Sequence, residues 1–115
     1  MRILHLSDTH NQHKNLGNLP EADLIIHSGD FSFAGTESEF RDFLKWFLNL
    51  NYQYKIFIGG NHDGFLEENS QKEIQSILPK NCHYLCHSGV TIENIKFWGV
   101  PMFVSEDIDG SYFEK

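Results

Sequence analysis

Three short apolar runs alternate with two amphipathic segments along the first eighty residues. The runs cover residues 3–6, 24–27 and 54–58 and consist largely of Ile, Leu, Phe and Tyr. Runs of four to five such residues are typical of β-strands. The first two runs are almost continuously apolar, so we expect these strands to be buried on both faces of a sheet.

The amphipathic segments predict two helices. Thr36 and Glu39 have the spacing of a capping box, in which each side chain accepts a backbone N–H that a helix start leaves free. Apolar residues then recur at helical spacing, and they are Phe40, Phe43, Leu44, Phe47 and Leu48. This pattern predicts a helix over 36–50 with its ring-bearing face on the sheet. Ser70 and Glu73 repeat the box and predict a shorter helix over about 70–78, ended by Pro79.

The order of these elements indicates the fold class. Strand, helix, strand, helix is typical of parallel strands joined by right-handed crossovers, so the run at 54–58 should lie parallel to the run at 24–27. From Cys82 onward, short alternating runs broken at 88–89 and 93–94 predict an antiparallel meander with strands at 90–92 and 95–98. No repeat or linker marks a boundary, so we interpret residues 1–115 as one α/β domain.

Composition narrows the classes of partner. The chain has 16 acidic and 9 basic side chains and a formal net charge of −7, which disfavours a nucleic-acid surface or an anionic membrane as partner. No run approaches the roughly 18 to 20 apolar residues of a membrane span, and the apolar start is too short for a signal sequence. We therefore predict a cytoplasmic protein.

The two cysteines are too few for a disulfide framework and are interpreted as reduced thiols. Cys82 and Cys86 flank a stretch that also contains histidine, which raises the alternative of a zinc site. Their spacing has three intervening residues rather than two, and no second pair exists. Ordinary strand packing is the favoured interpretation.

Residues of metal-ligand type follow each of the three strands. The loops read Ser7-Asp8-Thr9-His10, then Ser28-Gly29-Asp30, then Gly59-Gly60-Asn61-His62-Asp63. Ligands bind beyond the carboxyl ends of strands in open α/β sheets, so we expect the loops to meet at one edge, where glycines leave room for ions and substrate. The alternative is that Asp and Asn only shape turns and cap helices at these strand ends.

The donor set predicts a metal centre. Asp8, His10, Asp30 and Asn61 offer mixed oxygen and imidazole donors, which suit Mn, Fe, Zn or Ni ions and not a soft thiolate site. Asp30 has two oxygens and can bridge a pair of cations. Two ions about 3.5 to 4 Å apart hold a hydroxide and clamp a phosphoryl group for in-line attack.

The series Asp8-x-His10, Gly29-Asp30 and Gly60-Asn61-His62-Asp63, each part after a strand, resembles the calcineurin-like metallophosphoesterase superfamily. Residues 22–31, 54–63 and 89–101 are similar to its small metallophosphoesterase-domain proteins, whose better-known members are phosphodiesterases. The resemblance runs from residue 1 to about 101. It implies part of an αββα sandwich and hydrolysis of a small phosphodiester or phosphomonoester by a metal-bound hydroxide.

The resemblance also implies roles for individual residues and a cofactor of two divalent metal ions. Asp8 and His10 would bind the first metal, Asp30 would bridge, and Asn61 would bind the second. His62 would be the general acid that protonates the leaving oxygen, a role suited to imidazole near neutral pH. Asp63 would either orient His62 or cap the following helix.

One departure from the family pattern supports a second hypothesis. The pattern continues with another histidine and a GHxH-type segment, and neither occurs before Lys115. The chain thus resembles the N-terminal half of the family domain and is interpreted as C-terminally incomplete. It could instead be a catalytically impaired remnant that binds metal weakly or acts through protein contacts. A homodimer is expected to cover the apolar surface that the absent half would bury.

The remaining rings have structural interpretations. His5 and His27 lie within apolar runs and are interpreted as hydrogen-bonded core histidines. His13 is interpreted as a solvated loop residue, and its nearness to His10 leaves contact with a phosphate as the alternative. Phe31 and Phe33 are expected to pack beneath their loop, and the alternative is that they line the pocket beside Asp30. Trp46 lies off the helical stripe, which predicts an exposed ring at a contact.

Overall fold

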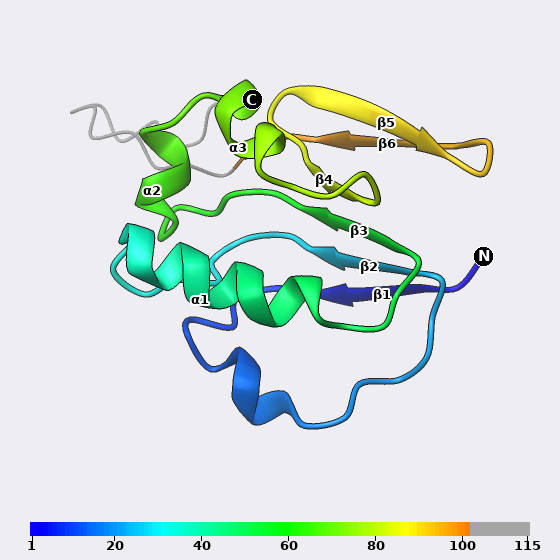
Figure 1. The fold of residues 1–115 in the computed structure, drawn as a ribbon, viewed down its shortest axis with the longest axis horizontal. Coiled ribbons are helices and arrows are strands. Elements are labelled where there is room, and N and C mark those ends of the chain that lie inside the picture. Colours follow the sequence, from blue (N-terminus) through cyan, green and yellow to red (C-terminus); the bar gives the residue numbers. More distant parts are fainter. Residues whose placement is uncertain (102–115) are drawn as a thin grey trace, which may run out of the picture.

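A computed structural model describes residues 1–101 of the chain (Figure 1). The elements in chain order are β1 (Ile3–Leu6), the 3-10 helix η1 (His13–Leu16), β2 (Leu24–His27), α1 (Glu37–Leu48), β3 (Tyr54–Phe57), α2 (Gly64–Glu67), α3 (Gln71–Ser76), β4 (Cys82–Tyr84), β5 (Ser88–Ile92) and β6 (Ile95–Gly99). The three predicted strands and the two predicted helices are present. The helices end earlier than expected, at Leu48 and at Ser76.

The strands of residues 1–101 form two sheets. One has four parallel strands in the order β1-β2-β3-β4, and the other is the antiparallel β5-β6 pair. The register aligns Leu4 with Ile25 and Ile26 with Ile56. The α/β class and the parallel arrangement of β2 and β3 are therefore confirmed.

Two sequence predictions about the strands are wrong. The meander does not begin at Cys82, because β4 pairs parallel with β3 after the connection through α2 and α3. Among the strands of residues 1–101, only β5 and β6 run antiparallel. Strand β1 is also not buried on both faces. It is the outermost strand, and its residues Ile3 and His5 are exposed on the face that β5 and β6 cover elsewhere.

Capping boxes start both predicted helices. The Thr36 hydroxyl accepts from the Glu39 N–H at the start of α1, and Ser70 and Glu73 make the same pair at α3. Each box satisfies donors that the first helical turn leaves free. The elements η1 and α2 are four residues long and carry no apolar period that could have predicted them.

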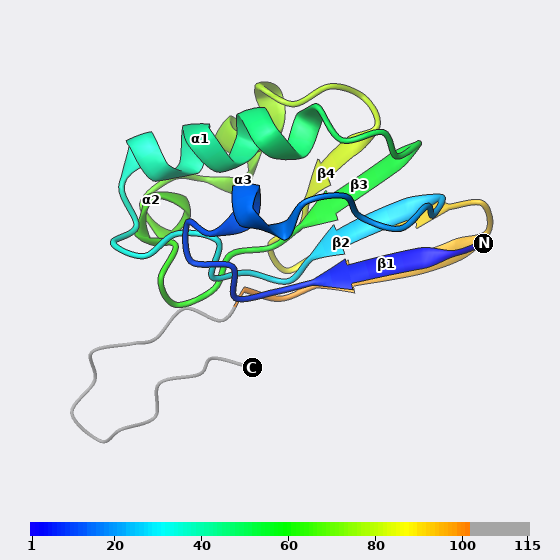
Figure 2. The same ribbon diagram turned by 90° about the horizontal axis from the view of Figure 1, so that it is seen from below.

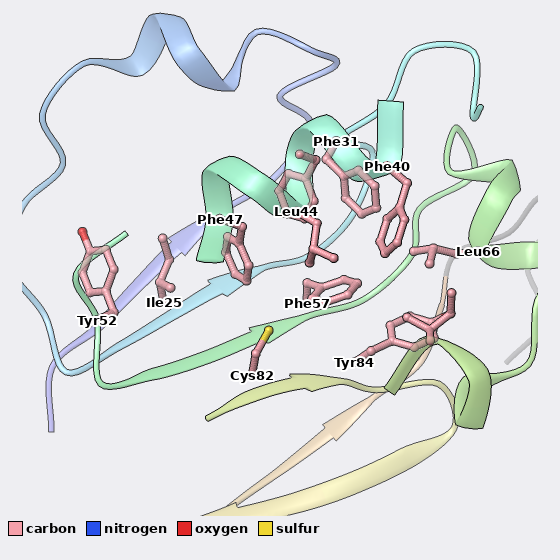
Figure 3. Close-up of a cluster of buried hydrophobic side chains, with 12 residues drawn as sticks. Ile25, Phe31, Phe40, Leu44, Phe47, Tyr52, Phe57, Leu66, Cys82 and Tyr84 are labelled. Atoms are coloured by element: carbon pink, nitrogen blue, oxygen red, sulfur yellow. The ribbon is translucent and has the colours of Figure 1, made fainter. Parts of the chain in front are cut away.

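An aromatic core fills the space between α1 and the parallel sheet (Figure 3). Phe40, Phe43 and Phe47 are fully buried, as the helical stripe predicts. Phe31 stacks on Phe43 with ring centroids 4.0 Å apart, and the Phe57 ring of β3 meets the Phe43 ring edge to face. Burial of such a ring contributes about 1.5–3 kcal/mol relative to its exposure, so this face holds the fold together.

The opposite face of the sheet is covered less completely. Leu24 and Ile56 are buried there against Ile92 of the β5-β6 hairpin. Figure 2 shows α1 on one side of the parallel strands. Beside the hairpin lies a cavity of about 470 Å³, lined by Ile26, Ser28, Ile56, Ile58, Leu85, Phe97, Trp98, Gly99 and Val100. Ile26, Ile58 and Phe97 are only half-buried, so part of this apolar face meets solvent. Trp98, which is 69% exposed, lies on the outer face of the hairpin, because successive side chains of a strand alternate and its neighbours Phe97 and Gly99 face the parallel sheet.

The structure confirms one of the histidine interpretations and corrects two. His27 is a buried core histidine, as predicted. His13 is buried rather than solvated, because η1 places its ring against Phe43 and Trp46, and Trp46 is in turn half-buried rather than exposed. His5 is exposed, since it lies on the open side of the outermost strand.

Phe31 is buried beneath its loop as expected, whereas Phe33 is 67% exposed.

Cys82 and Cys86 are free thiols, and burial raises the pKa of Cys82 to about 12, which fits strand packing rather than a zinc ligand. Within residues 1–101, none of the helices combines the length and apolarity needed to cross a membrane.

Candidate metal centre

The loops that follow β1, β2 and β3 meet at one edge of the parallel sheet, as predicted (Figure 1). The first loop is bonded to the second through its backbone. The N–H groups of Asp8 and His10 donate to the carbonyls of Gly29 and Asp30 at 2.9 Å and 3.0 Å. These long-range bonds hold the residues of the first loop beside Asp30.

Two glycines allow the second and third loops to approach closely. A Cβ on Gly29 would lie 2.6 Å from the Gly60 nitrogen, and a Cβ on Gly60 would collide with the Asp30 carboxylate. Gly29 also has a φ of +109°, which side chains rarely adopt. The expected role of glycine here, to leave space at the site, therefore holds at these two positions.

Three candidate ligands have left-handed backbone conformations. Asp8, His10 and Asp30 have φ values of 56°, 42° and 60°. Such conformations are unfavourable for residues other than glycine, although Asp, Asn and His tolerate them best. They persist where surrounding contacts impose them, and they cluster at functional sites. Here the backbone bonds between the loops supply those contacts.

Asp8, His10 and Asp30 form a cluster suited to a cation. One ligand atom from each lies within 4.8 Å of the others, and His10 Nε2 is 3.8 Å from Asp8 Oδ1. His10 Nδ1 lies 3.2 Å from the Ser32 carbonyl, which can only accept a hydrogen bond. The ring therefore carries its proton on Nδ1, and the Nε2 lone pair is free to bind a metal.

Electrostatics favour a charged carboxylate at Asp8. The hydrogen bond from the Ser7 side chain, with smaller contributions from Asp30 and the His10 ring, lowers the pKa of Asp8 below its ordinary value. Metal ligands of this type act in their deprotonated form. Asp8 is therefore ready to bind a cation at neutral pH.

Asn61 faces Asp30. Its side-chain amide lies 3.1 Å and 3.0 Å from the two Asp30 carboxylate oxygens, and with its NH₂ group on that side it donates a hydrogen bond to each. The Asn61 amide oxygen, the carboxylates of Asp8 and Asp30 and the His10 imidazole are together donors of the kind that divalent metals bind, so the donor chemistry fits such an ion.

His62 lies beside this cluster. Its backbone N–H donates to Asp30 Oδ1 at 2.8 Å, and its ring centroid lies 4.9 Å from that of His10. Nδ1 donates to the Phe33 carbonyl at 2.9 Å, so the other ring nitrogen, Nε2, is left for a further partner. The side chain is exposed and therefore accessible to a substrate.

Asp63 is the N-cap residue of α2, and its carbonyl accepts from the Leu66 N–H at 3.0 Å, but its side chain makes no capping hydrogen bond. None of the hydrogen bonds of its carboxylate within residues 1–101 goes to the His62 ring. Its buried carboxylate instead accepts backbone N–H groups from Gly60, Asp30 and Ser32 at 2.8, 2.6 and 2.9 Å. Burial raises the pKa of Asp63, although these three donors oppose the rise. Asp63 thus joins the second loop to the third.

The structure brings all five predicted site residues together, and they are Asp8, His10, Asp30, Asn61 and His62. Sequence reasoning missed the function of Asp63 because its partners lie up to 33 residues away. It also missed Glu39, which bonds to both Asn11 and Phe33 beside the centre. Its sequence signal, the capping box, indicated only a helix start.

Comparison with known proteins decides the family. The model of the calcineurin-like phosphoesterase family matches residues 1–111. The chain belongs to this family. Membership supports a phosphoesterase-type hydrolase that binds divalent metals, and the Asp and His cluster at the sheet edge agrees with it.

Relatives from animals match most of this chain. The human metallophosphoesterase domain-containing protein 1 is 32% identical over 122 residues, covering 87% of this chain and 37% of the human protein. A UPF0046 protein of Caenorhabditis elegans is 34% identical over 115 residues, covering 88% of this chain and 41% of that protein. The chain thus spans well under half the length of these relatives.

Proposed function

We propose that this chain is a metal-dependent phosphoesterase that hydrolyses a small phosphodiester or phosphomonoester. The observation that carries the proposal is the convergence of Asp8, His10 and Asp30 within 4.8 Å, at an edge where Asn61 and His62 also contact Asp30. Family membership supports the same class of reaction.

The proposed centre takes two divalent ions, of Mn, Fe, Zn or Ni. Asp8, His10, Asp30 and Asn61 are the residues that would hold these ions. Such ions activate water and neutralise charge on a phosphoryl group. The chain's own contribution is to keep the His10 proton on Nδ1 through the Ser32 carbonyl, so that Nε2 stays available.

His62 is the proposed general acid. The Phe33 carbonyl accepts its Nδ1 proton and thereby orients the ring. In the protonated ring, Nε2 carries the second proton and can give it to the leaving oxygen. The hydrogen bond from His62 N–H to Asp30 Oδ1 keeps this ring beside the metal ligands.

The proposed substrate is a small phosphate ester. The net charge of −7 opposes a long polyanion such as nucleic acid, whereas bound cations would attract a single phosphate group locally. A cytoplasmic location is part of the same proposal.

The alternative function is a weak metal-binding or protein-interaction module that forms homodimers. The exposed side chains of Ile3 in β1 and of Ile95 and Trp98 in β6 favour it, because apolar side chains that meet solvent seek a partner. Sedimentation velocity across a concentration series tests it. A dimer that Trp98→Ser abolishes supports self-association, and a monomer at every concentration excludes it.

The deciding experiment measures Mn²⁺-dependent hydrolysis of bis(p-nitrophenyl) phosphate and p-nitrophenyl phosphate, with Mn²⁺ binding measured by calorimetry. Asp30→Ala should abolish both binding and turnover, whereas His62→Ala should abolish turnover and leave most of the binding. His87→Asn is a matched control, since this histidine is exposed and has a φ of 52° that Asn tolerates. Mn²⁺ binding without turnover would overturn the enzyme proposal and favour the module.

A further inference from the structure

Glu39 accepts more hydrogen bonds than a helix cap requires. Its Oε1 accepts from the Thr36 N–H at 2.8 Å and from the Thr36 hydroxyl at 3.0 Å, which is the capping interaction. Its Oε2 points to other partners. It accepts from the N–H groups of Phe33 and Ala34, both at 3.0 Å, and from the Asn11 side chain at 2.5 Å.

The two oxygens therefore do different things. Oε1 accepts the capping bond at the start of α1. Oε2 instead accepts hydrogen bonds from the segment that follows Asp30 and from the residue that follows His10. Asn11 is also bound through its backbone, since its N–H donates to the Phe31 carbonyl at 2.8 Å. Glu39 thus holds the first two loops of the centre against each other.

The segment that Glu39 holds supplies the carbonyls that orient both imidazoles. The Ser32 carbonyl faces His10 Nδ1, and the Phe33 carbonyl faces His62 Nδ1. The N–H groups of Phe33 and Ala34 immediately follow these carbonyls along the backbone. A shift of this backbone would move both acceptors away from the two rings.

From this arrangement we propose that Glu39 is a positioning residue of the metal centre, acting through residues 32–34 to hold the His10 and His62 rings in their Nδ1–H form. The inference rests on the proposed function for its catalytic consequence, but its effect on the two rings exists without any reaction. Glu39 touches neither substrate nor metal in this assignment, so it is not a catalytic residue.

The charge of Glu39 suits this role. Partial desolvation by itself would raise its pKa, but donors from Thr36, Asn11, Ala34 and Phe33 outweigh that effect and lower the pKa to about 2. The carboxylate therefore presents only acceptors to these donors at neutral pH. A glutamine has one oxygen that accepts hydrogen bonds and one NH₂ group that donates them. One of the two groups of donors that Oε1 and Oε2 now bind would therefore lose its acceptor.

A second glutamate of this chain caps a helix without contacting the metal centre, and it serves as a control for the capping role of Glu39. Glu73 makes the same capping box with Ser70 at the start of α3, and none of its described hydrogen bonds reaches the centre. Glu39→Gln and Glu73→Gln thus change the two capping boxes in the same way, since the remaining amide oxygen can still accept from the backbone N–H of Thr36 or Ser70. A difference between these variants reports what Glu39 does beyond capping.

The test compares wild type, Glu39→Gln, Glu73→Gln and Asn11→Ala. Nitrogen NMR chemical shifts of the histidine rings measure the tautomers, calorimetry measures Mn²⁺ affinity, and urea unfolding measures stability. We expect Glu39→Gln to lower the Nδ1–H population of His10 and His62 and to weaken Mn²⁺ binding by about 10-fold, the scale seen for groups that orient metal ligands. Asn11→Ala should give a smaller change in the same direction, and Glu73→Gln should leave both rings as in wild type.

The inference is overturned if Glu39→Gln and Glu73→Gln lose similar stability and both keep the wild-type tautomers. The NMR measurement separates this failure from failure of the proposed function. Wild type that neither binds Mn²⁺ nor hydrolyses the esters contradicts the phosphoesterase proposal, whereas the ring tautomers in the metal-free protein still decide the role of Glu39.

Discussion

The aromatic core beneath α1 and the loop cluster at the sheet edge adjoin each other but are stabilised by different forces. The core consists of rings such as Phe43 and Phe57, which are fully buried. The cluster contains few apolar contacts and is held by hydrogen bonds from backbone N–H groups to Asp63 and Glu39. Ring burial is non-directional, whereas carboxylate bonds to backbone amides set direction and distance.

Because different forces stabilise them, the two regions have different roles in the molecule. Core residues determine whether the chain folds, and cluster residues determine where ligand atoms point. His27 connects the regions, because its ring packs on Phe43 while Nε2 bonds to the Thr9 hydroxyl at 2.9 Å and Nδ1 accepts the Gly29 N–H. Variants in each region should therefore have separable effects.

The largest expected effect comes from the core. Phe43→Ala should lower the free energy of unfolding by about 3–5 kcal/mol, because it leaves a cavity among packed rings. Folded molecules should bind Mn²⁺ as wild type does. Urea unfolding and calorimetry measure the two quantities. Phe33→Ala is the control, since a ring 67% exposed should contribute far less, and equal losses would break the comparison.

A variant in the loop cluster should lower both the free energy of unfolding and the Mn²⁺ affinity. Asp63→Ala leaves the N–H groups of Asp30, Ser32 and Gly60 without their acceptor, so we expect a loss of about 1–3 kcal/mol in unfolding free energy. Mn²⁺ affinity should fall as well, because Asp30 would lose its backbone anchor. Unchanged affinity in the folded variant would show that Asp63 is only structural.

His27, which connects the core to the loop cluster, should make the free energy of unfolding depend on pH. Burial lowers the pKa of His27 to about 3, so between pH 6.5 and 3 the unfolded chain binds a proton at this residue that the folded chain does not. Stability should therefore fall as pH falls below about 6.5, with a contribution of up to about 1.4 kcal/mol per pH unit. His27→Gln should flatten this slope in urea unfolding at a series of pH values. An identical slope in wild type and variant would contradict the assignment.

The smallest expected effect is stabilisation by metal. Mn²⁺ at five times its dissociation constant should raise the unfolding free energy of wild type by about 1 kcal/mol, because it binds only the folded form. Asp30→Ala should show no such rise, and the control His87→Asn should match wild type. Equal stabilisation of all three proteins would place the metal elsewhere.

Much of the fold follows from local sequence signals. The apolar period of α1, the capping boxes at Thr36 and Ser70 and the three strand runs each lie within a few residues, and the structure confirms them. The motif positions also sufficed to predict which five residues meet, because parallel strands bring their carboxyl ends to one edge.

The tertiary structure alone decided the features that depend on distant partners. Asp63 holds Asp30 across 33 residues, Glu39 holds Asn11 across 28, and His13 becomes buried only when η1 packs on α1. The pairing of β4 and the open face of β1 likewise follow from how the sheet is assembled. Periodicity and capping act within one or two turns of the chain, whereas these contacts exist only after the loops and sheets have come together.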